Sequence, residues 1–262
     1  MTVWLFLAAL LGGALNSVAG GGSFVTLPAL LYAGITPVVA NATSTLALWP
    51  GSVSSAIAYR HDIRTPNPAL LLLGSASLIG GLLGALLLVR TSDTSFMRLL
   101  PWLMLLAAAT FTFGGRVRLG RSVTDAERSL EARSRAFTTV RWKMLGILLV
   151  QLAIATYGGY FGGGMGIMML AALSVVGMTD IHEMNGLKAL LGATINGVAL
   201  AEFIRSHTVS WGPGLVMVVG GIIGGYVGAA LARKTERRVV RALVIAIGWS
   251  MTIYFFFLRA RP

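Results

Sequence analysis

Two glycine clusters, each inside a long apolar stretch, are the places in this chain where chemistry could be carried out. Gly20–Gly22 interrupt one stretch, and Gly162–Gly164 interrupt the other. Glycine weakens a helix by about 1 kcal/mol relative to alanine, so each cluster predicts a broken helix that resumes with unbonded backbone amides. Inside a membrane, such amides are tolerated only where they are buried in protein or line a cavity. Two interpretations remain open, namely close helix packing and a binding site formed by both breaks.

The ligand expected at such a site is an anion. A helix N-terminus carries the equivalent of about half a positive charge, so two half-helices that meet near the middle of a membrane would attract an oxyanion. The candidate substrate-binding residues are the backbone of the breaks and the polar side chains near them: Gly21, Gly22, Ser23, Asn41, Thr43 and Ser44 in the first half, and Gly163, Gly164, Met165, Asn185 and Lys188 in the second. Hydroxyl and amide groups can bind an anion and still release it.

Lys188 is a charged residue within a predicted membrane span. A charge there costs at least about 2.5–3.5 kcal/mol, so such residues usually face the protein interior and have a function. The alternative is that its ammonium group reaches the nearby membrane surface. Asn41 and Asn185 each precede an apolar stretch, and this position predicts a helix N-cap, which is compatible with ligand contact.

The composition indicates an integral membrane protein. The chain has 262 residues, of which 56% are hydrophobic and only 11% are charged, and its mean hydropathy is +0.79. The absence of cysteine excludes disulfides, thiolate catalysis and cysteine metal sites, and the sequence predicts neither a metal nor a cofactor. The net charge of +12 comes from loop arginines, which favour membrane topology and anionic lipid contact over nucleic-acid binding. The first apolar stretch has no basic residue before it and is interpreted as a mature segment.

The apolar stretches predict an all-α membrane protein with two repeats. The expected helical segments are 2–19, 23–33, 41–59, 68–89 and 96–114 in a first repeat spanning 1–115, and 144–158, 165–176, 184–204, 212–232 and 239–258 in a second repeat spanning 144–262. A basic polar segment, 116–143, connects them. One constant offset of 144 residues places Asn41 on Asn185 and Gly80 on Gly224, which indicates two copies of one unit.

The distribution of arginine and lysine predicts how the repeats cross the membrane. If each broken segment turns back as a re-entrant hairpin, each repeat adds three full crossings, and the two repeats are inverted. The loops 60–64, 116–143 and 233–241 then share one face and hold 15 of the 21 basic residues. The positive-inside rule places this face in the cytoplasm and both termini in the periplasm. The charge count does not distinguish a hairpin from two short spans.

Several of these motifs resemble one family when they are taken together. They are the glycine break followed by Asn-x-Thr-Ser at 41–44, the Gly-x-x-Gly-Ala helix in each half, and the second-half stretch GGYFGGGMG leading to NGLKALL. They resemble the TauE/SafE sulfite exporter family, also called the toluene-sulfonate uptake permease family. The resemblance covers nearly the whole chain and is weakest in the central basic segment.

The resemblance implies a carrier in the bacterial inner membrane for a small sulfur-containing anion such as sulfite or an organosulfonate. It implies alternating access without ATP, coupled to protons. The substrate-binding positions that the resemblance implies are Gly20–Gly22, Asn41, Thr43 and Ser44 in the first half, and Gly162–Gly164, Asn185 and Lys188 in the second half. Some members have Thr-Ser in both halves, whereas this second half reads Leu187-Lys188, which suggests that Lys188 supplies a charge for the anion.

Three other functions are compatible with the same residues. An anion channel could use the same breaks, and an intramembrane enzyme could use Ser23 as nucleophile with Lys188 as base. The three histidines lie in predicted loops, which argues against the enzyme. A lipid-interacting scaffold is supported only by the basic loops. The sequence leaves open the anion, the direction of transport, the coupling ion and the oligomeric state.

Overall fold

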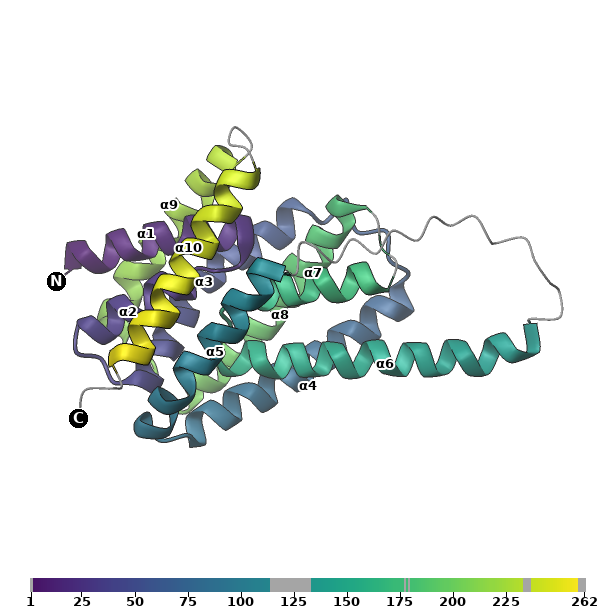
Figure 1. Ribbon diagram of the computed structural model, residues 1–262, viewed down its shortest axis with the longest axis horizontal. Coiled ribbons are helices and arrows are strands. Elements are labelled where there is room, and N and C mark those ends of the chain that lie inside the picture. Colours follow the sequence, from purple (N-terminus) through teal and green to yellow (C-terminus); the bar gives the residue numbers. More distant parts are fainter. Residues whose placement is uncertain (1, 114–132, 177, 179, 233–236, 259–262) are drawn as a thin grey trace.

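The computed structural model describes residues 2–113, 133–176, 178, 180–232 and 237–258 of the chain. The described residues form helices and no strands (Figure 1). The helices are α1 (Thr2–Ala19), α2 (Ser23–Tyr32), α3 (Pro37–Ala58), α4 (Asn67–Arg90), α5 (Asp93–Phe113), α6 (Arg133–Tyr160), α7 (Met165–Val175), α8 (Ile181–Arg205), α9 (Trp211–Ala232) and α10 (Arg237–Leu258). The prediction of an all-α protein is confirmed for this part of the chain.

Four of these helices are long and apolar enough to cross a membrane. They are α4, α5, α8 and the Trp211–Gly228 part of α9. Large apolar side chains such as Leu71, Leu215 and Val219 are more than half exposed on α4 and α9. Contiguous exposed apolar surface on helices of this length is expected where the helices face lipid. The structure therefore confirms a multi-pass membrane protein.

Two predicted helix starts were wrong. α3 begins at Pro37, where a proline without an N–H suits the first turn, and α8 begins after Asp180, whose side chain accepts hydrogen bonds from two amides of the first turn. Asn41 and Asn185 therefore lie inside their helices and are not N-caps. α6 begins at Arg133, within the predicted connecting segment, and the part of that segment from 116 to 132 lies outside the described residues.

The interruption between α1 and α2 reverses the direction of the chain. Gly20 has φ +77°, a left-handed conformation that other residues adopt only at a cost. From there α2 runs back along α1, since the ring of Tyr32 packs edge-on against Trp4 with centroids 6.3 Å apart. The break itself lies beside the middle of α3, because a Cβ on Gly22 would come within 2.9 Å of Leu48 Cδ1.

The interruption between α6 and α7 also depends on glycines with positive φ. Gly162 and Gly164 have φ +80° and +81°. This break lies beside the middle of α8, because a Cβ on Gly162 would lie 3.9 Å from Asn196 Oδ1. Both interruptions are thus at mid-depth in the bundle.

Helix contacts come in corresponding pairs. α1 packs along α9 as α6 packs along α4, and α3 contacts α9 as α8 contacts α4 (Figure 1). α2 contacts α10 as α7 contacts α5, and α3–α8 and α5–α10 are direct contacts. The long pairs approach closely at glycines: a Cβ on Gly84 would lie 2.1 Å from the carbonyl oxygen of Thr156. Small residues permit such close approach of membrane helices.

Candidate functional site

The two helix breaks touch each other through their main chains. The amide of Gly164 donates a hydrogen bond to the carbonyl oxygen of Gly20, with 3.2 Å between the atoms. A Cβ on Gly20 would lie 3.6 Å from the Cα of Gly166, so the contact extends into the first turn of α7. The structure therefore brings together two glycine clusters that are far apart in the sequence.

Lys188 lies against this contact. A Cβ on Gly166 would meet its side chain at Cδ, at 3.2 Å, and would meet the Cα of Gly20 at 3.8 Å. The stem of Lys188 thus packs on the same glycine that contacts the other break. Its ammonium group has no hydrogen-bond or ion-pair partner among the described side chains.

The breaks also leave backbone donors unbonded. In the first break, the described residues provide no acceptor for the amides of Gly21, Gly22 and Ser23, whereas the next amide, that of Phe24, bonds to the carbonyl of Gly21. In the second break, the amides of Gly163 and Gly166 likewise find no acceptor there. Unbonded amides at a helix start are the groups to which an anion can bind.

Ser44 is connected to the first break through the hydroxyl of Thr26. Its Oγ is within hydrogen-bonding distance of Thr26 Oγ1, which in turn donates to the carbonyl oxygen of Gly22. Both side chains are fully buried. Ser44 and Lys188 thus each lie beside one break, and they are 144 residues apart in the sequence.

Asn41 contacts the last residue of the helix that precedes the second break. Its Nδ2 donates to the carbonyl oxygen of Tyr160, at 2.9 Å, which satisfies one carbonyl of the last turn of α6. Its Oδ1 is buried and has no hydrogen-bond partner among the residues that the structure describes. The side chain therefore joins α3 to the end of α6 and retains an unused acceptor.

Three predicted site residues are less directly connected to the breaks. Thr43 points to α9, where its Oγ1 accepts from the amide of Ser210, at 3.0 Å. Asn185 lies one turn before Lys188 on α8. Met165, the first residue of α7, is buried against Gly158 and Gly192.

Sequence reasoning missed two aromatic residues that contact the second break. The hydroxyl of Tyr157 lies 2.6 Å from the carbonyl oxygen of Gly163 and 3.2 Å from that of Leu103. The ring of Phe111 reaches both breaks, because a Cβ on Gly21 or on Gly164 would meet it at 3.3 and 3.5 Å. An aromatic residue in an apolar helix is usually a packing residue, so the sequence alone does not distinguish Tyr157 and Phe111 from other aromatic residues.

The two carboxylates of α8 lie at its ends, away from the breaks. Glu202, 6% exposed, forms a two-bonded ion pair with Arg205 at the end of α8, at 2.6 and 2.8 Å. At the opposite end, Glu183 accepts from the amide of Arg64 and the hydroxyl of Thr65, which joins α8 to the loop after α3. Within the described residues, no group of three or more His, Asp or Glu side chains could hold a metal ion.

Comparison with known proteins assigns the chain to a family. The sequence pattern described as Sulfite exporter TauE/SafE matches residues 5–255. The chain is 28% identical to a probable membrane transporter protein, YfcA, of Escherichia coli K12 over 252 residues, which cover 95% of this chain and 87% of the relative. It is 26% identical to a probable membrane transporter protein of Haemophilus influenzae over 249 residues, covering 95% and 91% of the two chains.

A third relative, the probable membrane transporter protein ORF9 of a Sinorhizobium species, is 27% identical over 255 residues, covering 97% of this chain and 91% of its own. No solved structure matches the chain. The family pattern extends over both glycine breaks and nearly all of the described helices. The predicted resemblance is confirmed, and the chain belongs to the TauE/SafE sulfite exporter family of membrane transporters.

Proposed function

We propose that this protein is a secondary transporter that carries a small sulfur-containing anion, such as sulfite or an organosulfonate, across the bacterial inner membrane. One observation above all supports this function. Lys188 is a cation that has no hydrogen-bond or ion-pair partner within the described part of the chain, and it packs on the glycine at which the two breaks meet. An unpaired charge at membrane depth is costly, and an anion bound at the breaks would neutralise it.

The proposed ligand site combines this charge with neutral donors. The unbonded amides at Gly22–Ser23 and at Gly166 belong to the two segments that meet at the Gly20–Gly164 bond, and the stem of Lys188 packs on Gly166. Ser44 and Thr26 supply hydroxyls on the side of the first break. Asn41, Asn185 and Thr43 retain their proposed roles as hydrogen-bonding residues of a wider site. Such a mixture of one charge and several neutral donors favours reversible binding of a monoanion.

The proposed mechanism is alternating access between two inverted repeats, 1–115 and 144–262, with 116–143 between them. The paired helix contacts support this, because exchanging α1–α5 with α6–α10 turns most of the helix contacts, and all of the extensive ones, into one another. The bond from Gly164 to Gly20 supports it further, because these glycines are 144 residues apart and share the same left-handed φ. If the two repeats are inverted, two equivalent residues that bond to each other lie beside the pseudo-two-fold axis that relates the repeats. In transporters with inverted repeats, the substrate binds at that interface.

The arginine distribution favours an orientation with both termini in the periplasm. The start of α1 and the end of α10 lie toward the same end of the molecule in Figure 1, consistent with an even number of crossings. The loops around Arg60 and Arg237 would then face the cytoplasm.

Coupling to protons is part of the proposal, and Lys188 is the group best placed for it. The helices packed against α8 are α3, α4, α6 and α7. Over their described side chains, the titratable groups are Arg90 at the far end of α4 and Tyr157 and Tyr160 on α6. No carboxylate faces Lys188 from these elements, so a proton that travels with the anion would be held on its amine.

The test is thermal unfolding of the purified protein with sulfite, sulfate, thiosulfate, sulfoacetate, taurine, phosphate and chloride. A ligand that binds only the folded state stabilises it by RT ln(1 + [L]/Kd). We expect a selective shift with one sulfur oxyanion, lost in Lys188→Met and retained in the surface control Arg98→Gln. If no anion stabilises the wild-type protein, the proposed substrate class is wrong.

A further inference from the structure

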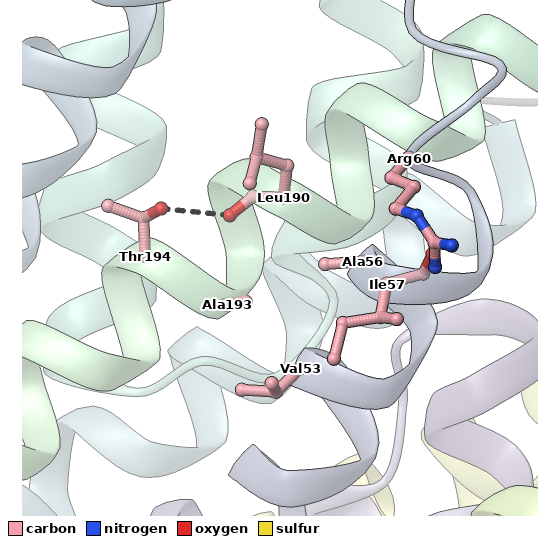
Figure 2. Close-up of a pocket in the computed structure, with 7 residues that line it drawn as sticks. All are labelled: Val53, Ala56, Ile57, Arg60, Leu190, Ala193 and Thr194. Atoms are coloured by element: carbon pink, nitrogen blue, oxygen red, sulfur yellow. Dashed lines mark hydrogen bonds between the residues drawn. The ribbon is translucent and has the colours of Figure 1, made fainter.

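A groove separate from the glycine breaks lies between α3 and α8. It has a volume of about 410 Å³ and is lined by Val53, Ala56 and Ile57 from α3 and by Leu190, Ala193 and Thr194 from α8, with Arg60 at one end (Figure 2). The hydroxyl of Thr194 donates to the carbonyl of Leu190, so the polar group of that wall is already bonded. The walls are therefore apolar, and the cation at the rim is the groove's charged group.

Arg60 has most of its hydrogen-bonding capacity free. Arg60 lies in the turn that follows α3; its side chain is exposed, and Nη1 donates to the carbonyl of Ile57, at 3.1 Å, at the end of that helix. A guanidinium group has five N–H donors, and this bond uses one of them. No carboxylate of the described residues forms an ion pair with it. The free donors suit a phosphate group.

The length and depth of the groove match one leaflet of a bilayer. Gly186, near the loop end of α8, packs against the carbonyl of Tyr59, and Thr194 lies eight residues further along the helix. Eight residues correspond to about 12 Å, which is somewhat less than half of a hydrocarbon core about 30 Å thick. The groove thus extends from the level of Arg60 toward the middle of the membrane.

The equivalent place in the other half of the molecule holds a tryptophan and lacks the arginine. The residues 144 positions after Val53 and Arg60 are Gly197 and Ile204, so the cation is missing there. The indole of Trp49 covers Gly197, with Nε1 3.1 Å from the position of a Cβ, and donates to the carbonyl of Ala193, at 3.0 Å. Of these two equivalent places in the described part of the chain, the one with a cation at its rim is therefore on the arginine-rich side.

We propose that this groove binds an anionic phospholipid of the arginine-rich leaflet, with its phosphate on Arg60 and one acyl chain between α3 and α8. The charge of Arg60 favours an anionic headgroup, and the apolar walls favour a hydrocarbon chain. The inference uses the orientation proposed above but not the transport activity. A protein that binds the lipid and no sulfur anion would contradict the transport proposal alone.

The experiment compares the melting temperature of the detergent-solubilised protein with added dioleoyl-phosphatidylglycerol, dioleoyl-phosphatidylethanolamine or soluble glycerol 3-phosphate. We expect the anionic lipid to stabilise the protein most and glycerol 3-phosphate to have no effect. Arg60→Gln should weaken binding of the anionic lipid about fivefold. The matched control is Arg90→Gln, which changes an exposed arginine at the end of α4. This variant should bind the anionic lipid with the affinity of the wild type.

A second variant tests the acyl-chain part of the site. Ala56→Phe fills the groove and should reduce stabilisation by both lipids while Arg60 is intact. If that variant does not fold, Ile57→Phe at the exposed rim replaces it. Equal stabilisation by the two lipids, an unchanged affinity in Arg60→Gln, or an equal shift with glycerol 3-phosphate would each overturn the proposal.

Discussion

Gly164 donates its amide hydrogen to the carbonyl oxygen of Gly20, so two residues 144 positions apart in the chain are joined where both helices are interrupted. Each has a left-handed φ, +81° and +77°. The contact holds the starts of α2 and α7 beside each other, with Lys188 packed on the neighbouring Gly166. This arrangement yields the first of four predictions.

Gly164→Ala should reduce both stability and anion binding. A non-glycine residue in this conformation costs about 1–2 kcal/mol, and the new Cβ would lie 2.8 Å from that of Ala107. Gly34→Ala is the matched control, because Gly34 has φ +82° and nothing within 4 Å of a Cβ. Thermal unfolding with and without the stabilising anion should show a loss of anion response in Gly164→Ala alone. The same response in both variants would contradict a role for the break in binding.

Gly84→Ala should separate α4 from α6. Its Cβ would lie 2.1 Å from the carbonyl oxygen of Thr156, and main-chain atoms cannot move aside without shifting a helix. We expect a loss of about 1–3 kcal/mol of unfolding free energy. Gly74→Ala, on the same helix with open space around it, should instead gain about 0.5–1 kcal/mol from helix propensity. Denaturant titration in mixed micelles measures both, and equal effects would refute the packing argument.

Tyr157→Phe should weaken the second break without disrupting the fold. The change removes the hydroxyl that lies 2.6 Å from the carbonyl oxygen of Gly163 and leaves that carbonyl unsatisfied. The expected cost is about 1–3 kcal/mol, with slower anion uptake into proteoliposomes. Tyr226→Phe, at a side chain that is 81% exposed, should transport as the wild type does. Unchanged uptake in Tyr157→Phe would show that the bond is dispensable.

Asp180 should make the start of α8 sensitive to acid. The amides of His182 and Glu183 donate to its carboxylate and hold the pKa of Asp180 below its usual range. Because the folded pKa is the lower one, the stabilisation is complete above the unfolded value of about 3.9 and is lost as the pH falls through the folded value. Amide exchange of the first turn of α8 should therefore accelerate below about pH 4 in the wild type.

Two variants check that acid sensitivity. In Asp180→Asn the exchange rate should not change between pH 5 and 3 once it is corrected for intrinsic chemistry. Ser92→Ala removes an uncharged cap at the start of α5, where Ser92 Oγ accepts a hydrogen bond from the amide of Ser95. This change should accelerate amide exchange in the first turn of α5 by the same factor at every pH. If the amide exchange rate of the first turn of α8 in the wild-type protein did not change with pH, the cap would not be a charged carboxylate.

Much of the fold follows from the pattern of apolar residues. Segments of sufficient apolar length predict the helices, and the ends of α1 and α6 at Ala19 and Tyr160 fall at the glycine clusters. The starts of α3 and α8 were misplaced, because an asparagine before an apolar run resembles a cap. In fact Pro37 and Asp180 begin these helices, and Asn41 bonds to Tyr160 instead.

The side-chain partners could not be predicted from one sequence. Thr43 and Ser44 are neighbours on α3, but they lie about 100° apart around the helix. One therefore contacts Ser210 before α9 and the other contacts Thr26 of α2. Choosing between them requires the positions of the surrounding helices. The pairing of Gly20 with Gly164 likewise depends on how the two halves assemble.

The main-chain nature of the Gly20–Gly164 bond has a consequence for how such proteins diversify. A hydrogen bond between two backbones involves no side chain, so substitutions that leave the helix positions unchanged should leave the bond intact. Positions 44 and 188 already differ, as serine and lysine, beside equivalent halves of that junction. On the proposed function, exchanging residues at these two positions should change which anion binds while the backbone contact between Gly20 and Gly164 is kept.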